Sequence, residues 1–338
     1  LWVEGNQWPL QSQTIKFNLS SSGQLTDVKT KGKVSVQSPL TTGSASGEYC
    51  VIWCGPDFPT DQRQDDINSL CFDTEPLENS VSILGASEFK VAITSDQDCG
   101  QIIVRLCDVS PSGSSKRISY GVLNLAMRNG LDCPKLVVAG EVMNVSIKLD
   151  DTGYQLPAGH RLRLAVSSAY FPLIWPAPKK AKLTLDLASS CLTIPCHDRS
   201  ATLVRDLGQG YVCPVKKTKK IRPEKHDRVI QTDARDGLVT TKINDDFGEF
   251  TFEEHNLTVG ESCNETHSIL PDDPYSASSE CCWHSHQSRP GWDINIYTQL
   301  KVTCDGDYFY LNSNIEALEN GVQIHQSQYQ EKLPRGFS

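Results

Sequence analysis

Residues 43–47 come nearest in this sequence to a hydrolytic nucleophile. A nucleophile elbow has the pattern Gly-x-Ser-x-Gly and lies between a buried strand and a helix, which hold the serine out of the turn. The segment begins and ends with glycine, but its centre is Ala45, and neither flanking element is predicted. A phosphate-binding glycine loop, a His-Glu-x-x-His pair and calcium-loop spacing are also lacking. We therefore predict no catalytic and no cofactor-binding residue in this chain.

Thiol and imidazole groups alternate at Cys282, His284 and His286. Alternate residues of a strand point to one face, and zinc takes thiolate and imidazole ligands. Three such ligands on one strand nevertheless span about 13 Å, too far for a single ion. We interpret them as an ordinary sheet face and predict no metal ligand. Two closer cysteine pairs are weaker candidates, which would form disulfides only in an extracellular protein: Cys50 with Cys54, and Cys191 with Cys196.

Three carboxylates gather at Asp61, Asp65 and Asp66, and they are the best candidates for a calcium site. Calcium needs six or more oxygen ligands. Arg63 lies among the three carboxylates and offers a simpler arrangement. We predict an ion-pair network here.

The chain has thirteen cysteines, an odd number. Several, such as Cys71 and Cys107, fall where the buried face of a strand is expected, and a buried free cysteine behaves as a small apolar residue. A disulfide framework usually shows an even count in a short secreted chain. We therefore expect reduced thiols and an intracellular, cytoplasmic protein. Four glycosylation sequons, a number expected by chance, do not change this: Asn18, Asn144, Asn256 and Asn264.

An apolar, proline-rich segment at residues 170–176 contains Tyr170, Phe171 and Trp175. Proline prevents it from being a central strand, and an apolar loop in water is costly unless it packs on something. Its own core, a neighbouring domain and a ligand are the three alternatives. We predict a domain interface, with a core loop as the nearest alternative.

The elements around these residues are strands almost throughout. Residues 161–166, 145–149 and 88–94 alternate apolar and polar side chains, as half-buried strands do, and residues 101–106 read as a more buried strand. Turn signals recur, and Asn320-Gly321 is the strongest because this pair suits a type I′ hairpin turn. We predict an all-β chain.

A boundary is expected between residues 196 and 228, where seven basic residues lie within 216–228. Residues 229–338 hold 6 basic and 18 acidic residues, a net charge of 6 − 18 = −12. We interpret the basic run as a solvated linker that offsets this charge. Residues 1–195 then form a two-sheet sandwich, and residues 229–338 form an antiparallel meander.

The composition of the chain argues against nucleic acid and membrane as binding partners. With 32 basic and 41 acidic residues the net charge is −9, which gives no general attraction to nucleic acid. No apolar run approaches the 18 or so residues of a membrane helix. The chain begins at Leu1 without a recognisable signal peptide, so we expect an internal or C-terminal piece of a longer protein.

Several segments together resemble the C-terminal half of hydrolases of the cocaine esterase and X-prolyl dipeptidyl-peptidase family, the CocE/NonD type. The resemblance runs in order from about Leu1 to Phe337. It rests on these segments: Leu1-Trp2-Val3-Glu4, Asp57-Phe58-Pro59-Thr60-Asp61-Gln62-Arg63-Gln64-Asp65-Asp66, Leu70-Cys71-Phe72-Asp73-Thr74-Glu75-Pro76-Leu77, Val104-Arg105-Leu106-Cys107-Asp108-Val109, Pro157-Ala158-Gly159-His160-Arg161-Leu162-Arg163-Leu164, Pro271-Asp272-Asp273-Pro274-Tyr275 and Leu333-Pro334-Arg335.

The resemblance implies that residues 1–195 are a galactose-binding-like jelly roll that follows an α/β-hydrolase domain in the same polypeptide. It also implies that 229–338 are the further β segment of longer members. The family's Ser, Asp and His lie upstream of the position matching Leu1, so no catalytic role passes to this chain. His160 belongs to a turn-strand motif and not to the triad.

The expected function is therefore that of the noncatalytic β half of a serine hydrolase that cleaves esters or Xaa-Pro peptides. The name of the fold does not confer sugar binding. The alternative is a free-standing carbohydrate-binding or adhesion module, which would need an exposed aromatic platform or a calcium site.

Overall fold

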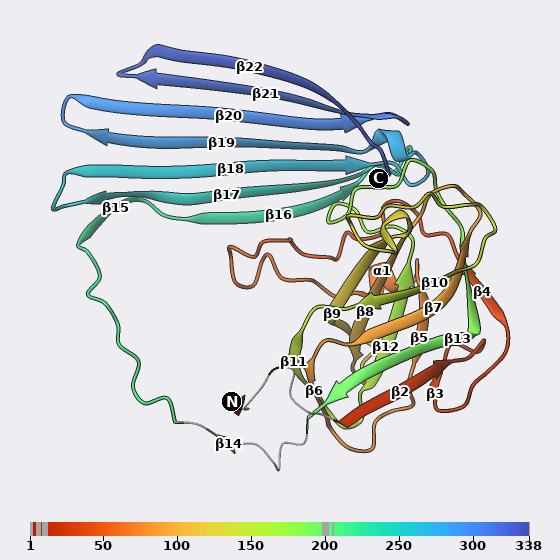
Figure 1. Ribbon diagram of the computed structural model, residues 1–338. Coiled ribbons are helices and arrows are strands. Elements are labelled where there is room, and N and C mark those ends of the chain that lie inside the picture. Colours follow the sequence, from red (N-terminus) through yellow and green to blue (C-terminus); the bar gives the residue numbers. More distant parts are fainter. Residues whose placement is uncertain (1–2, 5–7, 9–12, 198–202, 205, 338) are drawn as a thin grey trace. The chain divides into compact units, whose positions relative to one another are not determined.

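The computed structural model describes residues 3–4, 8, 13–197, 203–204 and 206–337 (Figure 1). The chain divides into two compact units. The first unit comprises residues 1–48, 59–210 and 337–338, and the second comprises residues 49–58 and 211–336. Strands dominate both units, so the prediction of an all-β chain is confirmed.

The first unit contains a large antiparallel sheet built on one long central strand. Strand β13 (Leu183–Cys196) pairs with β7, β2, β4 and β6, and a bulge between Asp186 and Cys191 changes its register with β7. Its other strands are β2 (Gln13–Leu19), β3 (Leu25–Thr26), β4 (Lys33–Val36), β6 (Val81–Gly85), β7 (Glu88–Ser95), β10 (Met143–Lys148) and β11 (Thr152–Leu156).

A second sheet of four strands has the order β5-β12-β8-β9. Every residue of β8 is buried, the polar residues Gln101, Arg105 and Asp108 included, whereas the burial of β12 alternates over residues 161–164 and is complete over residues 164–167. The strands are β5 (Leu70–Asp73), β8 (Gln101–Val109), β9 (Ser115–Asn124) and β12 (Arg161–Ser167). Short elements complete the unit: β1 (Val3–Glu4) paired with β14 (Leu203–Val204), helix α1 (Arg63–Asp66) and the turn η1 (Leu125–Met127).

The core of the first unit lies between these two sheets. Phe89 and Leu185 of the large sheet share one apolar cluster with Phe72, Leu106 and Leu164 of the four-stranded sheet. Two antiparallel sheets that bury their facing apolar side chains form a β-sandwich. The sandwich is thereby confirmed, and its jelly-roll connectivity stays a prediction.

The second unit is one long antiparallel sheet, and most of its strands follow one another as a meander (Figure 1). Glu319 pairs with Val322 around a two-residue turn in which Asn320 and Gly321 both have positive φ, at 50° and 76°, so the predicted hairpin is confirmed. The elements are β15 (Thr218–Arg222), β16 (Lys225–Thr232), β17 (Val239–Phe252), β18 (Leu257–Ile269), η3 (Pro274–Ser276), β19 (Ser278–Arg289), β20 (Trp292–Cys304), β21 (Tyr308–Glu319) and β22 (Val322–Pro334).

The basic run differs from the linker expected over residues 196–228. Residues 218–222 and 225–232 are strands that pair with β17, so the second unit begins well before residue 229. The backbone of both strands pairs with β17, and Arg222 also forms ion pairs with Asp246 and Glu249 of that strand. The expected compensation by the acidic region is present, but it is made by sheet pairing.

Residues 49–58 interrupt the sequence of the first unit and belong to the second. The Trp53 indole stacks on the Phe247 ring with centroids 5.6 Å apart. The buried carboxylate of Asp57 accepts the backbone N–H groups of Ile52 and Trp53, and it lies 3.6 Å from Nε2 of His226. Aromatic stacking and a carboxylate-capped turn thus hold this loop in the second unit.

Candidate functional site

The aromatic loop at residues 170–176 is mostly built into the sandwich. Tyr170 and Phe171 are only 1% and 5% exposed, whereas Trp175 is partly exposed. Phe171 and Trp175 meet edge to face at 6.1 Å, and the side chain of Gln101 donates a hydrogen bond of 2.8 Å to the Trp175 carbonyl. Of the three predicted interface residues, Tyr170 and Phe171 therefore anchor the loop in the interior of the sandwich, and Trp175 contributes to its surface.

Tyr170 is fastened at both its backbone and its hydroxyl. A Cβ on Gly43 would lie 2.5 Å from the Tyr170 carbonyl carbon, so the two backbones touch at a position where only glycine fits. Arg117 donates a hydrogen bond of 2.8 Å to the Tyr170 hydroxyl, which in turn lies 3.3 Å from Oε1 of Gln62. The glycine-rich segment that resembled a nucleophile elbow is thus a packing surface for the aromatic loop.

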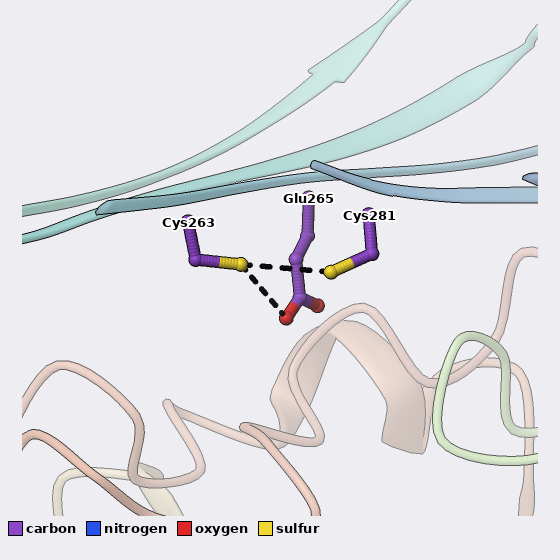
Figure 2. Close-up of side chains that lie close together, drawn as sticks. All are labelled: Cys263, Glu265 and Cys281. Atoms are coloured by element: carbon purple, nitrogen blue, oxygen red, sulfur yellow. Dashed lines mark hydrogen bonds between the residues drawn. The ribbon is translucent and has the colours of Figure 1, made fainter. Parts of the chain in front are cut away.

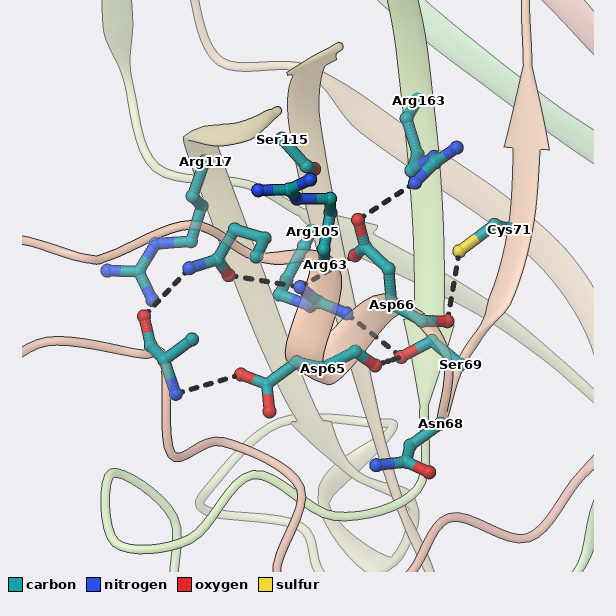
Figure 3. A network of polar contacts seen from close by, with 12 residues as sticks. Arg63, Asp65, Asp66, Asn68, Ser69, Cys71, Arg105, Ser115, Arg117 and Arg163 are labelled. Atoms are coloured by element: carbon teal, nitrogen blue, oxygen red, sulfur yellow. Dashed lines mark hydrogen bonds and ion pairs between the residues drawn. The ribbon is translucent and has the colours of Figure 1, made fainter. Parts of the chain in front are cut away.

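Beneath the loop lies a buried polar network centred on Arg105 of β8 (Figure 3). The guanidinium of Arg105 is fully buried, pairs with Asp66 at 3.0 Å, and donates to Gln62 at 3.0 Å and to Ser69 at 2.9 Å. Arg163 of β12 pairs with Asp66 at 2.9 Å and binds Asp73 through two nitrogens. A buried charge is tolerated only when it is paired and hydrogen-bonded, and both guanidinium groups meet that condition.

The pKa values of the groups in this network follow from pairing and burial. Hydrogen bonding to Asp73 holds the pKa of Arg163 above its ordinary value. Burial raises the pKa of Cys71, whose sulfur lies 3.4 Å from the Asp66 carbonyl, to about 12. Burial also raises the pKa of Asp65, although backbone N–H groups of Gly43 and Ala45 oppose that rise.

The three clustered aspartates serve three different partners. Asp61 pairs with the exposed Arg63 at 2.7 Å, Asp65 accepts the two backbone N–H groups, and Asp66 joins the buried Arg105 to the partly buried Arg163. The predicted ion pair with Arg63 is therefore found at Asp61, while the other two carboxylates point elsewhere. The network connects α1, β8, β12 and the aromatic loop, and its charged groups bind one another.

His160 also has a structural role. Its Nδ1 lies 2.6 Å from Oδ1 of Asp108, and the other oxygen of that carboxylate accepts the Tyr154 hydroxyl at 2.7 Å. These bonds fasten the turn before β12 to β8 and β11. They agree with the turn-strand motif inferred for His160 from the sequence.

The alternating group on β19 lies along one face, as the sequence indicates. His284 stacks on Tyr297 at 4.4 Å and hydrogen-bonds to Asn295 at 2.8 Å, and His286 binds Asp293 at 3.0 Å. Both histidines are thus engaged by β20. The opposite face brings together three residues that sequence reasoning did not combine: Cys263, Glu265 and Cys281 (Figure 2).

The described part of the chain contains no helix long and apolar enough to cross a membrane. Against known proteins, residues 2–228 match the model of the X-Pro dipeptidyl-peptidase C-terminal non-catalytic domain. The chain belongs to this family. The family resemblance inferred from the sequence is confirmed, and the match covers the whole sandwich together with β15 and part of β16.

Relatives within this family are larger proteins. The cocaine esterase of Rhodococcus sp. (strain MB1 Bresler) is 27% identical over 188 residues, which is 51% of this chain and 32% of that protein. A Xaa-Pro dipeptidyl-peptidase of Streptococcus pneumoniae serotype 19F (strain G54) is 34% identical over 106 residues, 31% of this chain and 14% of that protein. The chain thus matches less than a third of the length of either relative.

A solved aminopeptidase from a marine sediment archaeon (Thaumarchaeota archaeon) superposes with a TM-score of 0.49 at 17% identity. That superposition covers 57% of this chain and 38% of the aminopeptidase.

Proposed function

We propose that this chain is the C-terminal β portion of a serine hydrolase that cleaves esters or Xaa-Pro peptides, and that it supports an α/β-hydrolase domain upstream in the same polypeptide. The match of residues 2–228 to a non-catalytic C-terminal domain carries the proposal. The presence of an esterase and a dipeptidyl-peptidase among the relatives supports the two substrate classes. The family match favours this function over a free-standing carbohydrate-binding or adhesion module.

The aromatic loop is the proposed contact with the hydrolase domain. Gly43 and Gln101 contact its backbone and Arg117 binds the Tyr170 hydroxyl, so the loop is held in place before any partner binds. Preformed apolar surface binds with little loss of conformational entropy. Trp175 makes the contact, while Tyr170 and Phe171 hold it in place from within the sandwich.

Activity measurements on the isolated chain and on the full polypeptide test whether this chain is the noncatalytic portion of a serine hydrolase. The isolated chain is expected to hydrolyse neither nitrophenyl esters nor Gly-Pro-nitroanilide above background, and to resist a fluorophosphonate serine probe. The full polypeptide is expected to hydrolyse at least one of the two substrates. Stoichiometric labelling of a serine in the isolated chain would contradict the proposal, as would a full polypeptide that is inert toward both substrates.

The contact is tested with Trp175→Ala and Phe171→Ala, each made in the isolated chain and in the full polypeptide. Trp175→Ala should lower the melting temperature of the isolated chain less than Phe171→Ala does, because Trp175 is partly exposed although it packs on Phe171, while it lowers the activity or domain cohesion of the full polypeptide. Phe171→Ala should destabilise both, because its ring is buried. The control is Tyr211→Ala, which removes an aromatic ring that is 86% exposed. Equal effects of Trp175→Ala and Tyr211→Ala on the full polypeptide would refute the contact.

A further inference from the structure

Two strands of the second unit bring two thiols and a carboxylate to one face (Figure 2). Cys263 and Glu265 are alternate residues of β18, so their side chains leave the same face. On β19, Cys281 pairs with Glu265 and Trp283 pairs with Cys263. Cys281 is therefore the diagonal neighbour of Cys263, and the carboxylate of Glu265 lies between the two sulfurs.

The distances match those between ligands of one tetrahedral ion. The two sulfurs are 3.6 Å apart, Sγ of Cys263 lies 3.7 Å from Oε1 of Glu265, and the ligand atoms of all three residues lie within 4.8 Å of one another. Zinc bonds of about 2.3 Å to sulfur and about 2.0–2.2 Å to oxygen place tetrahedral ligands about 3.5–3.8 Å apart. A zinc ion therefore fits among these atoms with little movement of the strands.

A disulfide between the same cysteines fits less well. A sulfur–sulfur bond is about 2.05 Å long and normally joins Cα atoms about 4.4–6.8 Å apart, whereas diagonal residues of paired strands have Cα atoms about 7–8 Å apart. The observed separation of 3.6 Å is that of a contact between two thiols, and it is also compatible with two sulfurs on a shared ion. Bond formation would require the strands to shift.

Neighbouring side chains hold the Glu265 carboxylate in position, and the Cys263 thiol is shielded from water. The Glu265 carboxylate binds Nε2 of His267 at 3.1 Å, and Nδ1 of the same imidazole lies 2.8 Å from the Ser279 hydroxyl, so the position of the carboxylate is set by a further contact. Cys263 is only 2% exposed.

We propose that Cys263, Glu265 and Cys281 bind a thiophilic divalent cation, with zinc as the natural ion, and that His267 is a positioning residue for the Glu265 carboxylate. Two thiolates and one carboxylate are a donor set that selects zinc over calcium or magnesium. The ion would link β18 to β19 within the second unit, which lies largely beyond the residues of the family match. Such a site is independent of the proposed function of the sandwich.

The test uses the full 338-residue chain, purified under reducing conditions and stripped of metal with a chelator. We expect it to take up one equivalent of Zn²⁺ in equilibrium dialysis. Co²⁺ should give the intense absorption of a tetrahedral thiolate complex, which Zn²⁺ then displaces. Cys263→Ser and Cys281→Ser should each weaken Zn²⁺ binding by more than about 100-fold, because loss of a ligand costs more than the 10- to 100-fold typical of an outer partner.

The matched control is Cys282→Ser, which removes the neighbouring thiol from the opposite face and should leave Zn²⁺ binding unchanged. Glu265→Gln keeps the shape of the side chain and should also weaken binding, while His267→Gln should weaken it about 10- to 100-fold yet keep the tetrahedral Co²⁺ spectrum. Circular dichroism in chelator checks that each variant is folded. The proposal is overturned if the reduced wild-type chain binds no zinc. Cys263→Ser or Cys281→Ser binding zinc as well as Cys282→Ser, or a native Cys263–Cys281 disulfide under mass spectrometry, would also overturn it.

Discussion

Replacing Arg105 with methionine removes the central charge of the buried network but keeps most of its volume. The variant leaves Asp66 without one of its two guanidinium partners, removes the Arg105 donor of Ser69, and leaves Oε1 of Gln62 with the Tyr170 hydroxyl at 3.3 Å. Removing one partner of a buried ion pair costs about 3–5 kcal/mol. Arg163 still pairs with Asp66 at 2.9 Å, so we expect the lower end of that range, about 3 kcal/mol.

Arg63→Met is the matched control, because it also replaces an aspartate-paired arginine by methionine. The Arg63 side chain is 62% exposed, and an exposed pair contributes at most about 1 kcal/mol. A double variant with Asp66→Asn gives the coupling: Arg105→Met should cost less in that background, because no buried carboxylate charge loses its partner.

Urea unfolding followed by hydrogen exchange of peptides from β8 gives the free energy of unfolding for the first unit. Peptides from β20 in the second unit serve as an internal reference. If Arg105→Met costs no more than Arg63→Met, the network does not hold the sandwich together. If its cost is the same with Asp66 and with Asn at that position, the loss arises from packing and not from the ion pair.

Two further predictions concern the same unit. Burial raises the pKa of Cys107 to about 12, so at pH 8 only about one thiol in 10⁴ is ionised. Native Cys107 should therefore resist iodoacetamide while the exposed Cys133 reacts, as peptide mass spectrometry can show, and reaction of both at equal rates would contradict this. Five or six disulfides in the unreduced, denatured chain would contradict an intracellular protein. In thermal unfolding, Gly43→Ala should lower the melting temperature much more than Gly113→Ala does. Both glycines have positive φ, at 114° and 86°, but only a Cβ at position 43 would meet another backbone, 2.5 Å away. Equal losses would show that backbone strain alone explains the effect at position 43.

Much of the strand content was predictable from local sequence. Alternation over residues 145–149 reports a half-buried strand because side chains of a strand point to opposite faces in turn, whereas residues 161–166 form the predicted strand but alternate in burial only as far as residue 164. The Asn320-Gly321 hairpin was equally predictable, since its two positive φ values suit this pair. The absence of an elbow at residues 43–47 was also readable from the residue types.

The assignment of segments to units depended on long-range partners. The basic run was interpreted as a linker because seven cations dominate its composition, yet Arg222 lies in a strand and forms ion pairs with Asp246 and Glu249 of β17. Residues 49–58 carry no local sign that Trp53 stacks on Phe247, almost two hundred positions away. Likewise, nothing local distinguished Tyr170 and Phe171, which are buried, from Trp175.

The sequence by itself determined that Cys281 and Cys282 face opposite sides of one strand, because the period of two is a local property of the backbone. It could not show which residue lies beside each of them. That depends on the register of β18 with β19, which sets Glu265 opposite Cys281 and brings the sulfur of Cys263 within 3.6 Å. A shift of one residue in that pairing would turn the relevant side chains to different faces, so only the tertiary structure decided that two thiols and a carboxylate form one cluster.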